Sequence, residues 1–344
     1  MTPDGITSEW LSEVLGDDVE LVGTTRIGDG LVGMNLRLEL RRSQHSAVPA
    51  TLIAKLPTLD PTSRGTAKAL RTYEREVKFY EQIATTVDVR VAHCHYAEWT
   101  ESNDDFALLL EDLAPAQPGN QLTGCSAQQS RAAVLELARL HGPRWGDPTL
   151  DEIEFLQRRG ADDAAMLEGL WNMLLPGFLG TYAKYLDSEG IGLIERFGPR
   201  LIDWIAGHTM PATVTHGDYR LDNLMFRSAL GGYPIAAVDW QTPGHGAASG
   251  DVSYFLGAGP LPDLRREIER ELVEDYCGAL DEYGVTVDHD EFWRHFRRDA
   301  YSGIIMSVIA SQIVGESERS EAMFAAMATR HTRHALDLAA ESLI

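Results

Sequence analysis

Residues 216–226 read His-Gly-Asp-Tyr-Arg-Leu-Asp-Asn-Leu-Met-Phe, and no other stretch of the chain says as much about its fold. A short glycine-bearing turn and an apolar strand follow, and this strand ends in Val238-Asp239-Trp240. The segment therefore offers a carboxylate in Asp218, an amide in Asn223 and a second carboxylate in Asp239. The chain between Asn223 and Asp239 is long enough to form a β-hairpin, and such a hairpin can bring the amide and the second carboxylate together.

These residue types at this spacing fit phosphoryl transfer from ATP. Asp218 can orient an acceptor hydroxyl group and receive its proton as a general base. Asn223 and Asp239 can bind Mg²⁺ through oxygen atoms, with Asp239 bridging the metal to the β and γ phosphates. Arg220 can reach the transferred phosphoryl group and offset its charge. His216 is expected to brace the loop through hydrogen bonds rather than to transfer protons.

The alternative interpretation of Asp218, Asp222 and Asn223 is a polar turn whose side chains cap a helix. The sequence favours the catalytic interpretation, because polar turns rarely lead into an apolar strand that ends in another acid. Asp222 is then expected to be a bystander. Asp251 precedes an expected helix, where it can be an N-cap residue or an acceptor that fixes the backbone of the His216 loop.

The hydrophobic pattern predicts an α+β protein with two lobes, residues 1–112 and 113–344, joined at a Pro/Gly-containing hinge at 111–119. The first lobe is expected to be rich in β-strands, and the second is expected to be mainly helical. The strands are expected at 19–27, 36–40, 50–56, 91–99 and 106–110, with one helix at 67–84. The later helices are expected at 127–141, 162–186, 190–207, 261–283, 290–314 and 320–343.

Two features of the first lobe could bind a nucleotide. The turn at 28–33 carries Gly28 and Gly30, whose backbone could approach phosphates closely, although such a turn is also a common hairpin connection. Lys55 lies near the end of an apolar strand, where an ammonium group needs a partner. Glu76 on the following helix could supply it and hold Lys55 against the α and β phosphates. The alternative is a lysine and a glutamate that both lie on the surface.

Composition limits the class of protein further. The chain has 344 residues and a formal net charge of −22, which argues against a nucleic-acid-binding protein. Three cysteines without paired spacing indicate neither a disulfide framework nor a zinc site, and no apolar run is long enough for a membrane helix. The N-terminus lacks the pattern of a signal peptide, so a cytoplasmic protein without membrane insertion is expected.

The motifs resemble those of the aminoglycoside phosphotransferase and choline kinase group, which is related to the protein kinases. The resemblance rests on His216-Gly217-Asp218 with Asn223, and on Val238-Asp239-Trp240. The residue sequence of 217–223 is most similar to that of the kinase-like domains fused to acyl-CoA dehydrogenases and of the ecdysteroid-kinase-like set. The resemblance implies a bilobal protein kinase-like fold with ATP and Mg²⁺ as cofactors. It also implies that Leu108–Leu113 is the hinge, in which the backbone at Glu111 and Leu113 receives adenine.

The leading hypothesis is an ATP- and Mg²⁺-dependent kinase that phosphorylates a hydroxyl group of a small molecule. The first alternative is a pseudokinase that binds nucleotide and acts as a regulatory or interaction module. The second is a metal-dependent hydrolase built from His216, Asp218, Asp239 and His245. The acceptor pocket is expected in the helical lobe, near Trp145, Trp171, Trp204, Tyr254 and residues 300–325. A neutral or hydrophobic alcohol is slightly favoured over an aminoglycoside-like polycation; the oligomeric state and the preference for ATP over GTP stay open.

Overall fold

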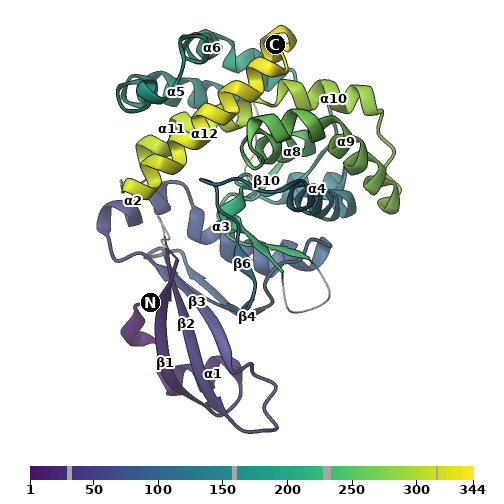
Figure 1. The fold of residues 1–344 in the computed structure, drawn as a ribbon. Coiled ribbons are helices and arrows are strands. Elements are labelled where there is room, and N and C mark those ends of the chain that lie inside the picture. The colour runs from purple at the N-terminus through teal and green to yellow at the C-terminus, as the bar shows by residue number, and fades with distance from the viewer. Residues whose placement is uncertain (29–32, 157–160, 228–233, 315–316) are drawn as a thin grey trace.

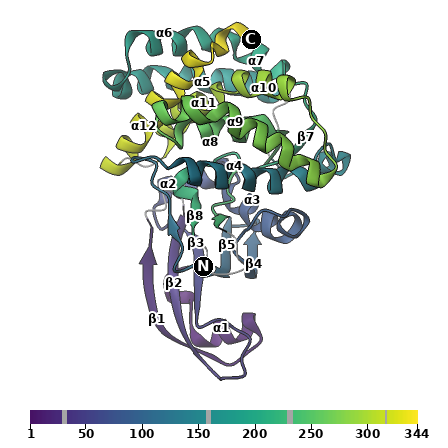
Figure 2. The same cartoon turned by 45° about the vertical axis from the view of Figure 1, so that its right-hand side comes forward.

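The computed structural model describes residues 1–28, 33–156, 161–227, 234–314 and 317–344. A small lobe built on a β-sheet and a larger helical lobe lie one above the other (Figures 1 and 2). The expected combination of an antiparallel β-rich N-terminal region and a mainly helical C-terminal region is therefore confirmed. Within the described residues, no helix is both long enough and apolar enough to cross a membrane.

The sheet of the small lobe has the strand order β1-β2-β3-β5-β4, and neighbouring strands are antiparallel. Alternate residues of one strand point to opposite faces, and here both faces are covered. Leu109 packs with helix α1 (Ser8–Leu15), which the sequence analysis missed, whereas Leu108 packs into the core shared with the helical lobe. The strands are β1 (Val19–Ile27), β2 (Gly33–Arg42), β3 (Thr51–Pro57), β4 (Cys94–Thr100) and β5 (Asp105–Glu111).

The sheet register decides which way Lys55 points. Lys55 lies opposite Leu108 in the β3–β5 ladder, and paired residues of an antiparallel ladder share a face. That face is the one covered by helix α3 (Thr72–Lys78), which contacts β5 and carries Glu76. The expected meeting of Lys55 with Glu76 therefore follows from register and helix placement together.

The single helix expected at 67–84 is wrong. The chain forms α2 (Pro61–Ala69), then α3, then a π-helical turn η2 (Phe79–Ile83). The break occurs because Arg71 has a positive φ of 56°, a left-handed conformation that cannot continue a right-handed helix. The side chain of Arg71 binds Glu74 in the first turn of α3, with an Nε–Oε2 distance of 2.7 Å.

Short strands carry the segment at 216–240 between the two lobes. Strand β7 (Ala212–Thr215) leads into the loop and pairs with β10 (Gly244–Ala247). Strand β8 (Leu224–Phe226) pairs with both β9 (Ile235–Ala237) and β6 (Gln117–Pro118). The expected hairpin between Asn223 and Asp239 is thus present, although its turn at 228–233 lies outside the described residues.

Three expected helices of the second lobe are each divided. The one at 190–207 is interrupted at Gly198-Pro199, since proline cannot donate the hydrogen bond that would continue the helix. The one at 290–314 breaks after Arg298, and the one at 320–343 ends at Asp337, before Ala339 with a φ of 47°. The helices are α4 (Ala127–His141), α5 (Ala161–Tyr182), α6 (Ser188–Phe197), α7 (Leu201–Ala206), α8 (Ala248–Ala258), α9 (Pro262–Leu280), α10 (His289–Arg298), α11 (Tyr301–Ile313) and α12 (Glu318–Asp337).

Short 3-10 turns connect several of these elements. They are η1 (Pro3–Gly5), η3 (Ala84–Thr86), η4 (Gly142–Arg144), η5 (Pro148–Glu152), η6 (Ala183–Tyr185), η7 (Gly198–Arg200), η8 (Leu221–Asn223), η9 (Asp281–Tyr283) and η10 (Ala340–Leu343). Turn η8 lies inside the 216–226 stretch and ends at Asn223, so it sets the direction in which that side chain leaves the loop.

Candidate active site

The carboxylate of Asp218 is held by three side chains. Its Oδ2 accepts hydrogen bonds from Nε of Arg220 at 3.1 Å and from Nδ2 of Asn223 at 3.0 Å. Its Oδ1 accepts one from the hydroxyl of Tyr254 at 2.6 Å. All three partners donate hydrogen bonds to the carboxylate, so its orientation is fixed, as the positioning of a general base requires. The side chain of Asp218 keeps 22% of its surface exposed, so it can still meet a substrate.

His216 braces the loop, as its position in the sequence suggested. Its Nε2 lies 3.1 Å from the carbonyl oxygen of Val238, and its Nδ1 accepts from the backbone N–H of Asp218 at 3.3 Å. The ring is fully buried and contacts Trp240 with a centroid separation of 4.4 Å. The imidazole therefore ties the Asp218 loop to the segment after β9 that carries Asp239, and both ring nitrogens are occupied by this task.

Asp251 fixes the backbone of the same loop through its carboxylate. It is not an N-cap residue as one expectation had it, because Ala247 caps α8 and Asp251 lies within the helix. Its two carboxylate oxygens accept from the backbone N–H groups of His216 at 2.6 Å and Gly217 at 3.1 Å. Burial raises the pKa of this carboxyl, but the hydrogen bond and charge of His141 together with His216 bring the pKa below its usual value. Asp251 is thus an acceptor for the loop backbone.

Gly217 is required by the shape of the loop. Its φ is +79°, which side-chain-bearing residues rarely adopt, and a Cβ atom there would overlap with the carbonyl oxygen of Thr242. The glycine thus permits the sharp turn that presents Asp218 directly after the buried strand β7.

The hairpin places Asn223 next to Asp239. Leu224 pairs with Ala237, and the backbone N–H of Val238 donates to the carbonyl oxygen of Asn223 at 2.9 Å. The side-chain Nδ2 of Asn223 donates to the Asp218 backbone oxygen at 2.9 Å as well as to the Asp218 carboxylate. Since the nitrogen is engaged in this way, the amide oxygen is the atom left to bind a cation. A hard divalent cation prefers oxygen ligands, so Asn223 and Asp239 fit Mg²⁺.

Lys55 joins the two lobes at this point. Its Nζ lies 2.7 Å from Oε1 of Glu76 and 2.6 Å from Oδ1 of Asp239. Burial lowers the pKa of Lys55, but the two carboxylates outweigh that effect and raise it above its usual value. Burial likewise raises the pKa of Asp239, yet the Lys55 ammonium holds it below its usual value. The lysine therefore stays charged and Asp239 stays ionised.

A stacked aromatic pair supports this arrangement. Trp240, next to Asp239, lies against Phe79, with ring centroids 3.9 Å apart and planes at 5°. Phe79 follows α3 directly, so the stack fixes the helix of Glu76 relative to the segment of Asp239.

Arg90 organises the predicted hinge. Its guanidinium binds both carboxylate oxygens of Glu111 at 2.6 and 2.7 Å, and its carbonyl oxygen accepts from the Ala237 N–H at 2.9 Å. Glu111 is the last residue of β5, and Leu113 packs into the shared core just beyond it. The role of the Glu111 and Leu113 backbone in adenine binding stays a prediction, but the hinge is anchored to the strand that leads to Asp239.

Glu136 on α4 completes this junction by accepting the backbone N–H of Arg90, and burial raises its pKa from 4.5 to about 7. A carboxyl whose pKa is raised on folding makes the protein less stable as pH rises from about 4.5 to 7, by up to about 3 kcal/mol. Glu136→Gln removes this titration. The free energy of unfolding of the variant relative to the wild type should therefore increase from pH 5 to pH 8, as measured by urea denaturation. The control is Glu267→Gln, at an exposed position, which should show no such trend with pH.

The expectations for the glycine-bearing turn at 28–33 and for Asp222 have different outcomes. Gly28 directly follows β1 and has a φ of 67°, whereas Gly30 lies outside the described residues. Asp222 is not a bystander: its carboxylate accepts from Nη1 of Arg220 at 2.8 Å and from the backbone N–H of Gln121 at 3.0 Å. It therefore orients Arg220 and joins the loop to the chain beyond the hinge.

Of the residues expected near the acceptor pocket, some lie in the core and others contact the site. Trp171 and Trp204 are fully buried in the core and cannot line a pocket. Tyr254 contacts the site because its hydroxyl donates to the carboxylate of Asp218. Met323 contacts the site as well, with its sulfur atom 3.3 Å from Nη1 of Arg220. Burial of large aromatic side chains is a tertiary property, so periodicity alone did not distinguish these groups.

The hydrolase alternative is not supported by the geometry. His245 lies on β10 and faces Asp151 at 3.6 Å, while both ring nitrogens of His216 are used within the loop. In the described part of the chain, no group of three or more His, Cys, Asp or Glu side chains could hold a metal ion. The carboxylate of Asp239 is therefore paired with Lys55, and that of Asp218 with Arg220, Asn223 and Tyr254, rather than with histidines.

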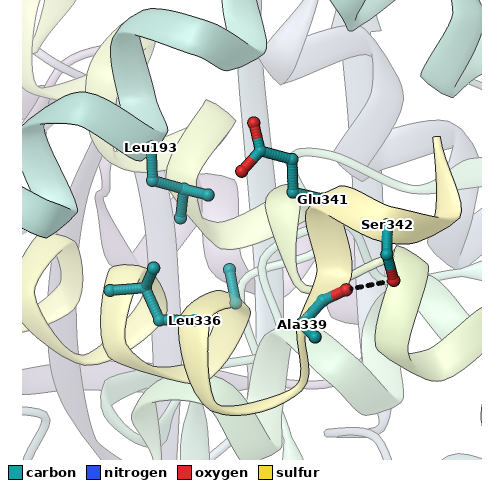
Figure 3. Close-up of a pocket in the computed structure, with 6 residues that line it drawn as sticks. Leu193, Leu336, Ala339, Glu341 and Ser342 are labelled. Carbon is teal, nitrogen blue, oxygen red and sulfur yellow. Dashed lines mark hydrogen bonds between the residues drawn. The ribbon is translucent and has the colours of Figure 1, made fainter.

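A separate apolar pocket of about 370 Å³ lies between α6 and the end of α12 (Figure 3). Figure 1 places α6 and the C-terminus on the side of the helical lobe that faces away from the sheet. The pocket is lined by Leu193, Ala335, Leu336, Ala339, Glu341 and Ser342. None of these residues belongs to the site around Asp218.

Comparison with known proteins shows the family and the fold. The sequence pattern of the group described as the phosphotransferase enzyme family matches residues 45–289, which is more than half of the chain. The chain belongs to this phosphotransferase family, and its fold is the bilobal protein kinase-like fold.

Solved structures show the same fold at low sequence identity. A choline kinase from Cryptosporidium parvum superposes with a TM-score of 0.57 at 10% identity, covering 93% of this chain and 89% of that one. The streptomycin–ATP–APH(2″)-IIa ternary complex superposes with a TM-score of 0.51 at 13% identity, covering 88% and 91%. Acyl-CoA dehydrogenase family member 10 from Mus musculus is 27% identical over 36% of this chain, and the match spans only 13% of that protein's length.

Proposed function

We propose that the chain transfers the γ-phosphoryl group of ATP to a hydroxyl group of a small molecule with the help of Mg²⁺. The observation that carries this proposal is the contact of Lys55 with both Glu76 and Asp239. Three distant segments contribute to this one constellation. Its residue types and connections are those that phosphoryl transfer uses.

Each residue has a distinct task in the proposal. Lys55, positioned by Glu76, binds the α and β phosphates, and the backbone near Glu111 and Leu113 binds the base. Asn223 and Asp239 hold Mg²⁺, which when bound neutralises charge on the phosphates. Asp218 orients the acceptor hydroxyl and receives its proton. Arg220 offsets charge on the transferred group, a task for which its planar guanidinium is suited.

The acceptor is proposed to be a neutral or hydrophobic hydroxyl compound. Beside Asp218 lie the ring of Tyr254, the guanidinium of Arg220 and, in contact with Arg220, the thioether of Met323. The second acid of the loop, Asp222, is already paired with Arg220. A polycation would need uncompensated carboxylates at this place. We further propose a cytoplasmic enzyme whose partner is this small molecule rather than nucleic acid or a membrane.

Removal of the metal tests the cofactor part of the proposal. With EDTA present, phosphoryl transfer should fall to background and the affinity for ATP should weaken, and added Mg²⁺ should restore both. Isothermal titration of ATP with and without Mg²⁺ measures the binding step separately from turnover. An affinity for ATP that does not respond to Mg²⁺ would contradict the roles given to Asn223 and Asp239.

The activity itself is tested with Mg²⁺-ATP and a panel of hydroxylated compounds that spans aminoglycosides, amino alcohols, hydroxy acids and lipid alcohols. Phosphorylated products are detected by ³¹P NMR and mass spectrometry, and ADP formation reports slow transfer to water. If Mg²⁺-ATP raises the unfolding temperature but neither the panel nor water receives a phosphoryl group, the chain is instead a nucleotide-binding interaction module.

A further inference from the structure

Tyr254 provides a contact to the proposed base that the known motif residues do not account for. Its hydroxyl donates to Oδ1 of Asp218 at 2.6 Å, although Tyr254 lies 36 positions further along the chain, on α8. The ring is 4% exposed. A buried tyrosine hydroxyl needs a hydrogen-bond partner, and here the partner is the atom group that would take the acceptor's proton.

The two oxygens of the Asp218 carboxylate are not equivalent. A carboxylate offers about two acceptor positions per oxygen. Oδ2 already accepts from Arg220 and Asn223, which fills its positions. Within the described part of the chain, Oδ1 accepts a hydrogen bond from Tyr254 alone. An acceptor hydroxyl must therefore approach Oδ1, directly beside the Tyr254 hydroxyl.

The ring of Tyr254 is held in place by His331 on α12. The two rings stack with centroids 5.3 Å apart and planes at 23°. His331 is 1% exposed, and its ring lies close to glycine residues of two other helices. A Cβ atom added at Gly257 on α8 or at Gly303 on α11 would overlap with the imidazole. Because the slot is this narrow, the imidazole has no room to swing aside and stays stacked on the ring of Tyr254.

His331 acts through packing rather than through hydrogen bonds. In the described part of the chain, neither of its ring nitrogens has a hydrogen-bond partner. Burial lowers the pKa of His331 well below its usual value, and the neighbouring His334 and Arg330 lower it further. The ring is therefore neutral and adds no positive charge behind Tyr254.

We propose that Tyr254 is a positioning residue for the base, and that His331 clamps it so that Oδ1 of Asp218 points at the acceptor hydroxyl. The inference rests on the proposed role of Asp218 and adds two residues to it. Tyr254 stays in place during turnover and forms one wall of the acceptor site. The acceptor hydroxyl then shares Oδ1 with the phenol hydroxyl.

Kinetics test the positioning role. Tyr254→Phe should lower kcat roughly 10- to 100-fold, the effect of losing one hydrogen bond to a charged group, with KM for ATP changed less than about threefold. His331→Ala should cause a similar loss, and the double variant should be no worse than Tyr254→Phe alone, because both act on one contact. Tyr182→Phe, another buried tyrosine stacked on an aromatic ring, should keep full kcat.

A second measurement does not depend on turnover. In protein labelled with ¹³C at tyrosine Cζ, the resonance absent in Tyr254→Phe belongs to Tyr254 and reports the donation of its hydroxyl. It should shift in Asp218→Asn and shift or broaden in His331→Ala and stay unchanged in Tyr182→Phe. If it is unchanged in Asp218→Asn, or if folded Tyr254→Phe keeps kcat within twofold, the proposal is overturned. A protein that transfers no phosphoryl group but shows these shifts would retain the contact and lose only the proposed function.

Discussion

Asp218→Asn is expected to lower kcat by about 10²- to 10⁴-fold, the usual contribution of a positioned general base. The asparagine has the shape of the aspartate, so its oxygen can still accept from Arg220 and Asn223 while its amide faces Tyr254, whose hydroxyl can turn to accept. The loop should therefore keep its conformation. Only the capacity to receive the acceptor proton is lost.

The affinity for Mg²⁺-ATP should change less than about threefold in this variant, because Lys55 and Asp239 are untouched. Turnover of ATP with an accepted hydroxyl compound and equilibrium binding of ATP together separate chemistry from binding. The matched control is Asp222→Asn in the same loop, which should reduce kcat less than tenfold, because Asp222 orients Arg220 and accepts from the Gln121 N–H but does not take the acceptor proton. Unchanged turnover in Asp218→Asn would falsify the assignment of the base.

Asp251→Ala is expected to lower the free energy of unfolding by about 3 kcal/mol or more, the range for removal of one partner from a buried charged network. The carboxylate is buried and accepts from the backbone N–H groups of His216 and Gly217, and it faces Nε2 of His141 at 3.4 Å. Without it, these donors stay buried and unpaired. The loss is therefore much larger than for a surface acid.

Urea denaturation monitored by tryptophan fluorescence measures this effect. Asp263→Ala is the control, because the Asp263 side chain is 97% exposed and its ion pair with Arg266 lies on the surface. That variant should stay within about 0.5 kcal/mol of the wild type. Equal stability of Asp251→Ala and Asp263→Ala would show that the loop backbone is supported by other groups.

Much of the site could be predicted because its signals are local in sequence. The spacing of Asp218, Asn223 and Asp239 implied a hairpin, and the hairpin is present with Leu224 opposite Ala237. Lys55 in an apolar strand needed a partner, and Glu76 is that partner at 2.7 Å. In both cases a physical requirement, either hairpin geometry or the cost of a buried charge, limited the arrangements that the sequence allowed.

Other features could not be read from local patterns. Helical periodicity continues through Arg71, but its positive φ ends one helix and starts another. The roles of Asp222 and Asp251 depend on which backbone N–H groups their carboxylates accept from. For Asp222 this group is the N–H of Gln121, and for Asp251 it lies in the His216 loop. Trp171 and Trp204 share their residue type with pocket residues, yet both are fully buried in the core.

The sequence by itself determined which groups can do chemistry and that they alternate with strands and turns at the spacing of a phosphoryl-transfer site. Only the tertiary structure decided how those groups are oriented. Lys55 meets Asp239 across 184 positions of the chain, and Tyr254 donates to Asp218 while its ring stacks on His331 of α12. The reason is physical: residue type fixes charge and hydrogen-bonding capacity, whereas direction and burial come from packing between elements that are far apart in the chain.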